Sequence, residues 1–118
     1  MKKVVTVSLG SSKYDNTFKT QFLGQDFELV RHGAEVVVLD RLPAGSAGWT
    51  VLPPGVETHV ADLTDMDAVA RAIEGVDAVC HQAARVGLGV DFDDVTDYVT
   101  DNDLGTGVLL RALWQARF

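Results

Sequence analysis

An unbroken run of branched apolar residues, Val36-Val37-Val38-Leu39, restricts the fold of this chain more than any other feature. A strand with one face in water alternates apolar and polar residues, whereas a strand that is apolar throughout needs cover on both faces. Parallel sheets flanked by helices provide that cover. Residues 35–39 therefore predict an interior strand of an α/β sheet, with Asp40 directly after its last residue.

Three further segments have strand character. We predict a first strand at residues 3–9, a weaker third strand at residues 56–60 and a fourth at residues 76–81. Right-handed crossovers with short connections order the four strands 3-2-1-4, which is a partial Rossmann-like parallel sheet. The carboxyl ends of parallel strands share one edge, where ligands bind in such folds. The residues delivered to that edge are Gly10, Asp40, Ala61, Asp62, Gln82, Ala83 and Ala84.

Two helices are indicated. The first begins with Thr64 as its N-cap and ends before Gly75, and its inner face carries Met66, Val69, Ala70 and Ile73. The second spans about residues 94–116, with an inner stripe of Val95, Tyr98, Val99, Asn102, Gly105, Leu109, Ala112, Leu113 and Ala116. Glycine in a helix costs about 1 kcal/mol relative to alanine. We expect close packing at Gly105 and Gly107 to offset that cost.

Residues 17–31 lie between the first two strands, and their alternating pattern favours a β-hairpin. A helix is the alternative, because Phe18, Phe22 and Leu29 align roughly on one face. Gly24 interrupts that helix and makes it the less favoured interpretation. The sequence thus predicts a hairpin in place of the first helix.

The composition restricts the partners of this chain. Its 118 residues amount to a single domain, and a net charge of −7 argues against nucleic-acid binding. No apolar run approaches the ~20 residues of a membrane span, so we expect a cytoplasmic protein without membrane contact. Cys80 is the single cysteine and has no intramolecular partner for a disulfide. No histidine or cysteine spacing indicates a metal site.

The residues after the second and third strands carry the candidate chemistry. Asp40 can accept hydrogen bonds from both hydroxyls of an adenosine ribose, or it is simply a solvated loop acid. Arg41 beside it could instead favour a phosphate, so the choice between NAD and NADP stays open. Asp62 can accept from an adenine amino group while Leu63 packs on the ring, although acids are also common near helix starts.

Four segments together resemble the NAD-dependent epimerases and dehydratases, the extended short-chain dehydrogenase/reductase family that acts on nucleotide sugars. They are residues 33–40, 60–65, 75–84 and 102–106, which occur in the order and with gaps similar to the family's. The resemblance implies an NAD site with Asp40 at the adenosine ribose and with Asp62 and Leu63 at the adenine. It further implies that Ala83, Ala84 and Arg85 lie along the pyrophosphate and nicotinamide ribose, with Asn102 a structural residue behind the cofactor.

Two departures from the family qualify that expectation. The family's Gly-x-x-Gly-x-x-Gly turn is missing, because Gly10 is followed by no further glycine before Gly24. The family's catalytic Tyr-x-x-x-Lys pair is also missing, since Phe18 and Asn102 stand four residues after the two tyrosines. We therefore expect weak NAD binding, no catalytic residue and no turnover by this chain alone. A nucleotide-sugar substrate would require the family's C-terminal lobe.

Other interpretations remain open. Residues 3–33 resemble the start of proteins known as quinate 5-dehydrogenases, which implies a chimera joined near residues 31–34, with 1–33 atypical and 34–118 epimerase-like. A loop at Ser11-Ser12-Lys13 would then contact a small-molecule ligand. A recombined or designed folding module without any ligand is the main alternative. The apolar fourth strand would form an open sheet edge, through which we expect a second copy to pair.

Overall fold

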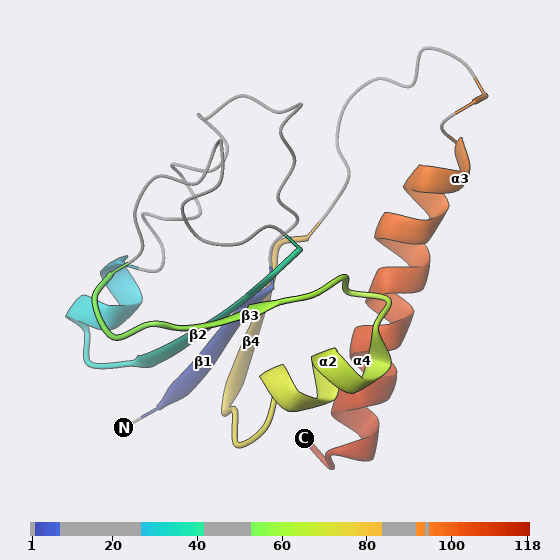
Figure 1. The fold of residues 1–118 in the computed structure, drawn as a ribbon. Coiled ribbons are helices and arrows are strands. Elements are labelled where there is room, and N and C mark those ends of the chain that lie inside the picture. Colours follow the sequence, from blue (N-terminus) through green and yellow to red (C-terminus); the bar gives the residue numbers. More distant parts are fainter. Residues whose placement is uncertain (1, 8–26, 42–52, 84–91, 94) are drawn as a thin grey trace.

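The computed structural model describes residues 2–7, 27–41, 53–83, 92–93 and 95–118 (Figure 1). Its strands are β1 (Lys3–Val7), β2 (Glu35–Asp40), β3 (Glu57–Val60) and β4 (Ala78–His81). Its helices are α2 (Met66–Ala72), α3 (Val95–Tyr98), the π-helix η1 (Val99–Leu104) and α4 (Gly105–Gln115). Residues 27–31 are also helical.

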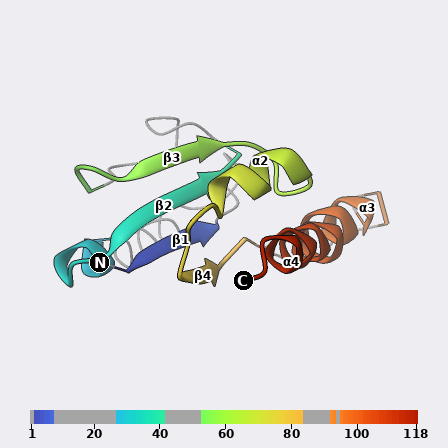
Figure 2. The same ribbon diagram turned by 90° about the horizontal axis from the view of Figure 1, so that it is seen from below.

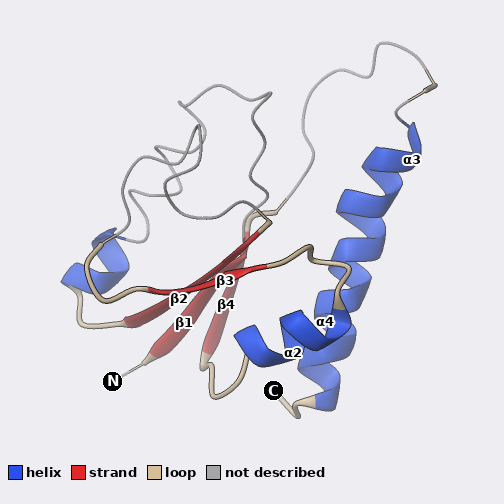
Figure 3. Ribbon diagram, viewed as in Figure 1, coloured by secondary structure: helices blue, strands red, loops and turns tan. Residues whose placement is uncertain are grey.

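The four strands form one parallel sheet of order β3-β2-β1-β4, as predicted from the sequence (Figure 2). Val7 at the end of β1 pairs with Leu39 of β2 and with His81 of β4, and Asp40 pairs with Val60. The carboxyl ends therefore lie together along one edge, which confirms the partial Rossmann-like α/β fold. The secondary-structure view in Figure 3 shows the helices packed beside this sheet.

Both faces of the two central strands are buried. On one face, Val5, Val7, Val37 and Leu39 join Val69 of α2 and Leu109 of α4 in the main core. The alternate residues Val4, Thr6, Val36 and Val38, each at most 6% exposed, point to the opposite face. This two-sided burial is the reason that the apolar run of β2 tolerates no polar alternation.

Helix α2 confirms the first predicted helix, but the prediction of its N-cap was wrong. Asp65 caps the helix by accepting from the backbone N–H of Ala68 at 3.2 Å. Thr64 instead donates to Asp62, a local bond that removes Thr64 from the capping position. On the inner face, Ala70 is exposed, contrary to prediction, whereas Val69 is buried.

The second predicted helix runs without interruption through α3, η1 and α4. Gly105, Leu109 and Ala112 of its stripe are buried, but Val95 and Val99 are 45% and 52% exposed. The stripe assumed 3.6 residues per turn, whereas a π-helix closes i→i+5 bonds and takes more residues per turn. Tyr98 and Asn102 of the stripe are nevertheless half-buried, so the inner side continues through η1 at the predicted spacing.

The two glycines of this helix differ. A Cβ on Gly105 would lie 3.0 Å from Cδ2 of Leu63, so the predicted close approach is confirmed there. The same expectation was wrong for Gly107, which is exposed and would meet nothing within 4 Å.

The hairpin prediction was wrong in its second half, because residues 27–31 are helical; the remainder, residues 17–26, lies outside the described residues. The helix closes with bonds from the N–H of Gly33 to Val30 and of Ala34 to Leu29, both 3.0 Å. Gly33 takes φ = 87°, the left-handed conformation that ends many helices. Within the described residues, no helix has the length and apolar character needed to cross a membrane.

Candidate functional site

The predicted site residues that the structure describes gather along the carboxyl edge of the sheet. Asp40 ends β2 and is 4% exposed, and Ala83, two residues after β4, is 5% exposed. Backbone bonds extend the sheet past its strand ends: Ala61 N–H donates to the Asp40 carbonyl (3.0 Å) and Gln82 N–H to the Val7 carbonyl (2.9 Å). These bonds fix the neighbouring strand tips relative to one another.

Six residues of the predicted sites are not placed by the structure. Gly10, the Ser11-Ser12-Lys13 loop, Ala84 and Arg85 lie outside the described residues. Their expected roles therefore stay predictions, including the contacts expected along a pyrophosphate. Asn102 is described and is half-buried inside η1, on the helix that packs beside the sheet.

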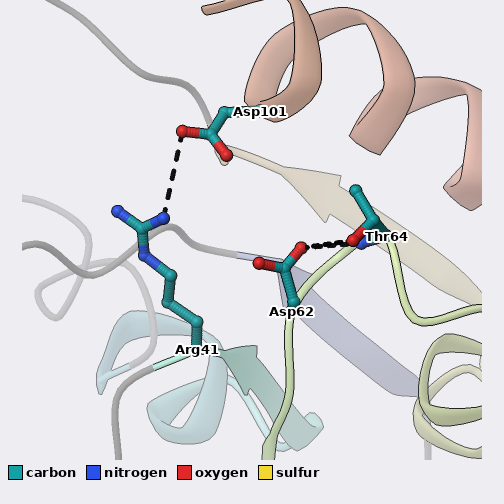
Figure 4. A network of polar contacts seen from close by, with 4 residues as sticks. All are labelled: Arg41, Asp62, Thr64 and Asp101. Atoms are coloured by element: carbon teal, nitrogen blue, oxygen red, sulfur yellow. Dashed lines mark hydrogen bonds and ion pairs between the residues drawn. The ribbon is translucent and has the colours of Figure 1, made fainter. Parts of the chain in front are cut away.

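A polar cluster of Arg41, Asp62, Thr64 and Asp101 stands at the ends of β2 and β3 (Figure 4). Asp62 accepts two hydrogen bonds from Thr64, one from its N–H (2.9 Å) and one from its hydroxyl (2.8 Å). The guanidinium of Arg41 forms an ion pair with Asp101, with 3.9 Å between Nη1 and Oδ2. Only 8% of the Asp101 side chain is exposed, against 26% for Arg41.

The carboxyl group of Asp62 has a pKa below its ordinary value. The backbone N–H of Thr64 is the largest cause, the Thr64 hydroxyl and the Arg41 charge act in the same direction, and burial opposes them. Asp62 is therefore an anion near neutral pH, with acceptor capacity beyond the oxygen that Thr64 occupies.

Leu63, between these two polar residues, points the other way. It is 6% exposed and belongs to the main core, where it packs against the backbone of Gly105. Its side chain thus connects the end of β3 to α4 within the main core. The predicted contact between Leu63 and an adenine ring stays a prediction.

The end of β4 is uncharged in character. His81 Nε2 and Thr106 Oγ1 share a hydrogen bond of 2.8 Å, which links β4 to the first turn of α4. Burial lowers the pKa of His81, so its imidazole is neutral near pH 7. Ala83, two residues further on, is 5% exposed, and its methyl group belongs to the main core.

This arrangement can bind a ligand that donates hydrogen bonds. The carboxylates of Asp40 and Asp62 come from neighbouring strands and accept bonds from hydroxyl or amino groups. In the part of the chain that the structure describes, no three His, Cys, Asp or Glu side chains gather as ligands for one metal ion. This pair of acceptors fits an adenosine, whose ribose hydroxyls and amino group are all donors.

Sequence reasoning missed two contacts at this edge, Arg41 with Asp101 and His81 with Thr106. Each joins a strand tip to a helix residue at least 25 positions away in the chain. No local pattern encodes such a pairing, although the position of Arg41 directly after Asp40 marked it as a residue of the site.

Comparison with known proteins gives two matches to family models. A model of the NAD-dependent epimerase/dehydratase family matches residues 27–118, and one of a domain of unknown function, DUF8753, matches residues 3–37. None of the curated proteins matches the chain. The second model carries no activity, so the resemblance of residues 3–33 to quinate dehydrogenases stays a prediction.

Solved structures of similar fold include a UDP-glucose 4-epimerase with a TM-score of 0.74 and 22% identity; 98% of this chain and 33% of that chain align. The UDP-glucose 4-epimerase of Thermus thermophilus, solved with NAD, gives 0.69 and 28%, covering 98% and 34%. A short-chain dehydrogenase/reductase superfamily protein of Agrobacterium tumefaciens, solved with bound NAD, gives 0.64 and 27%, covering 96% and 29%. The present chain thus spans about a third of the length of these proteins.

Proposed function

Because the chain belongs to the NAD-dependent epimerase/dehydratase family, we propose that its sheet edge is the adenosine-binding side of an NAD site. Two of the similar structures, at 28% and 27% identity, were solved with NAD. The chain would supply the cofactor-binding part of an enzyme of this kind, which acts on nucleotide sugars.

The position of Asp40 is the observation that carries this proposal. Its carboxylate stands at the end of β2, and the backbone bond to Ala61 fixes the tip of β3 beside it. A carboxylate at this point of a parallel sheet accepts hydrogen bonds from both hydroxyls of the adenosine ribose. Asp40 is 4% exposed, so a ligand that reaches it is shielded from water, where hydrogen bonds to a charged acceptor are strongest.

The remaining described residues support the same ligand. Asp62 would accept a hydrogen bond from the adenine amino group, because its pKa lies below the ordinary value and its carboxylate stays ionised. Ala83 would allow a close backbone approach, and Asn102 would support the site from η1. NAD, when bound, supplies a nicotinamide ring that takes up and returns a hydride.

We further propose that the chain is catalytically incomplete on its own. Its 118 residues contain no tyrosine followed four positions later by lysine, the pair that moves a proton in this family. Binding without turnover is therefore the activity that we assign to it.

A titration with NAD tests the proposal. Binding should change the fluorescence of Trp49 and Trp114 and raise the melting temperature, with about 2.7 kcal/mol of added stability at 100 times the dissociation constant. Asp40→Ala should weaken binding about tenfold or more, because it removes a charged acceptor worth about 1.5–3 kcal/mol. Asp97→Ala, on the exposed side of α3, is the matched control and should bind like the parent.

No response at millimolar NAD would overturn the proposal. It would leave the alternative that this chain is an α/β folding module without a ligand. Equal affinities of the parent and Asp40→Ala would show that NAD binds elsewhere.

A further inference from the structure

The ion pair between Arg41 and Asp101 lies next to the proposed ribose site, and the proposed function does not yet account for it. Arg41 directly follows Asp40. In related sites, an arginine near this carboxylate binds the 2′-phosphate of NADP. The charge of Arg41 is directed instead to Asp101, on the helix beside the sheet (Figure 4). Enclosed ion pairs add little stability compared with apolar contacts, so stability alone does not account for this one.

Asp101 is set apart from the other acids of its helix. Its side chain is 8% exposed, whereas Asp97 and Asp103 are exposed to solvent. It also lies within η1, and single π-helical turns of this kind are often found at functional sites. General attraction of acids to a helix N-terminus therefore does not explain its enclosed position.

We propose that Asp101 is a specificity-determining residue, which holds Arg41 away from the ribose and so selects NAD over NADP. This inference rests on the proposed function. Asp101 pairs with the guanidinium of Arg41, the Arg41 charge also acts on Asp62, and Asp40 directly precedes Arg41 in the chain. These four residues together carry a formal charge of −2. A 2′-phosphate brings about −1.5 to −2 more charge at pH 7, and Asp101 occupies the guanidinium that could pair with it.

The test compares the cofactors and their adenosine ends. Calorimetry would measure the affinity of the 118-residue chain for NAD, NADP, adenosine 5′-phosphate and adenosine 2′,5′-bisphosphate. Asp101→Asn should strengthen binding of NADP relative to NAD, and of adenosine 2′,5′-bisphosphate relative to adenosine 5′-phosphate, about tenfold in each case. The reason is that Arg41 becomes available to the 2′-phosphate. Asp103→Asn makes the same charge change at an exposed position two residues away and should leave the ratios unchanged.

A second substitution separates positioning from general charge. Combined with Asp101→Asn, Arg41→Ala should abolish the gain in affinity for the 2′-phosphorylated compounds. As a single substitution, Arg41→Ala should leave the ratio of NAD to NADP affinity nearly unchanged, because Asp101 already holds Arg41 in the parent. Asp101→Glu should keep the parent's preference. If Asp101→Asn does not fold by circular dichroism, Arg41→Ala alone decides: a tenfold loss of NADP affinity would overturn the inference.

The two proposals fail in different ways. Normal NAD binding with no change of ratio in Asp101→Asn overturns only the role of Asp101. A parent chain that binds none of the four compounds overturns the proposed function and, with it, this inference.

Discussion

The segment after β3 makes two kinds of contact, and they differ in what they contribute. Asp62 and Thr64 belong to the polar cluster, where the side chains stay partly in water. Leu63 between them enters the main core and packs on Gly105. Gly105 of α4 receives the Leu63 contact, and Asp101, one helical turn before it, pairs with Arg41 at the end of β2.

This difference separates stability from recognition. Burying a leucine side chain contributes about 1.5–3 kcal/mol, whereas ion pairs, exposed or enclosed, add little net stability. We therefore expect changes in the polar cluster to affect the fold less than changes in the apolar contact. We expect variants of the apolar contact to change stability and variants of the polar cluster to change binding.

Leu63→Ala should have the largest effect on stability. Removing a buried leucine leaves a cavity between β3 and α4, and such changes cost about 2–5 kcal/mol. Val60→Ala is the control, since Val60 is 54% exposed and three residues away, and we expect it to cost about 0.5 kcal/mol or less. Urea unfolding followed by circular dichroism measures both. A loss below 1 kcal/mol for Leu63→Ala would remove the distinction between the two contacts.

The two glycines of α4 should respond with opposite signs. Gly107→Ala should stabilise by about 0.5–1 kcal/mol, because the position is exposed and open and alanine favours the helix. Gly105→Ala should lose about 1 kcal/mol, because its Cβ would stand 3.0 Å from the packed Leu63. Thermal unfolding of the pair tests this. Equal gains at both positions would mean that Leu63 moves aside freely.

The sequence predicted the sheet because its signals are local. The apolar run before Asp40 requires a strand covered on both faces, and that requirement, with short connections, leaves few topologies. The placement of Asp40 and Asp62 at one edge followed directly from parallel pairing, which the structure confirms. Whether these residues bind a ligand stays a proposal.

The errors arose where signals compete or act at long range. Residues 27–31 alternate like a strand, but Gly33 and the preceding basic residues, Arg31 and His32, form a helix end that outweighed the alternation. The stripe of the long helix failed at Val95 and Val99, near the start of the helix, because no pattern within a helix shows how much of its length the rest of the fold covers. The pairing of Arg41 with Asp101 depends on the packing of a distant helix and has no signature in either neighbourhood.

Asp62 should make a smaller contribution to the free energy of unfolding, and that contribution should depend on pH. Its folded pKa lies below its unfolded value of about 3.9, so its contribution is present above that pH and is lost as the pH falls through the folded value. Asp62→Asn keeps an acceptor for Thr64 but removes the charge. It should therefore cost less than about 1 kcal/mol at pH 7 and flatten the acid limb of the stability curve.

Thr64→Val provides the matched measurement for this residue. It removes the hydroxyl donor, and carboxyl-carbon NMR should show the Asp62 pKa rising toward its ordinary value. An unchanged titration would mean that the hydroxyl bond contributes nothing to holding the carboxylate ionised.

His81 tests a polar contact that lacks charge, and its effect should be the smallest. Burial lowers its folded pKa below about 6.5, so as the pH falls the unfolded chain takes up a proton before the folded one does. Stability should therefore decrease by a few tenths of a kcal/mol between pH 7.5 and 5.5, an amount kept small by solvent access. His81→Gln retains a side chain able to bond Thr106 without titrating, and should lose this dependence. A parent and variant with parallel curves would show that the imidazole is equally easy to protonate in both states, and the end of β4 would then join the polar cluster as a surface able to carry charge.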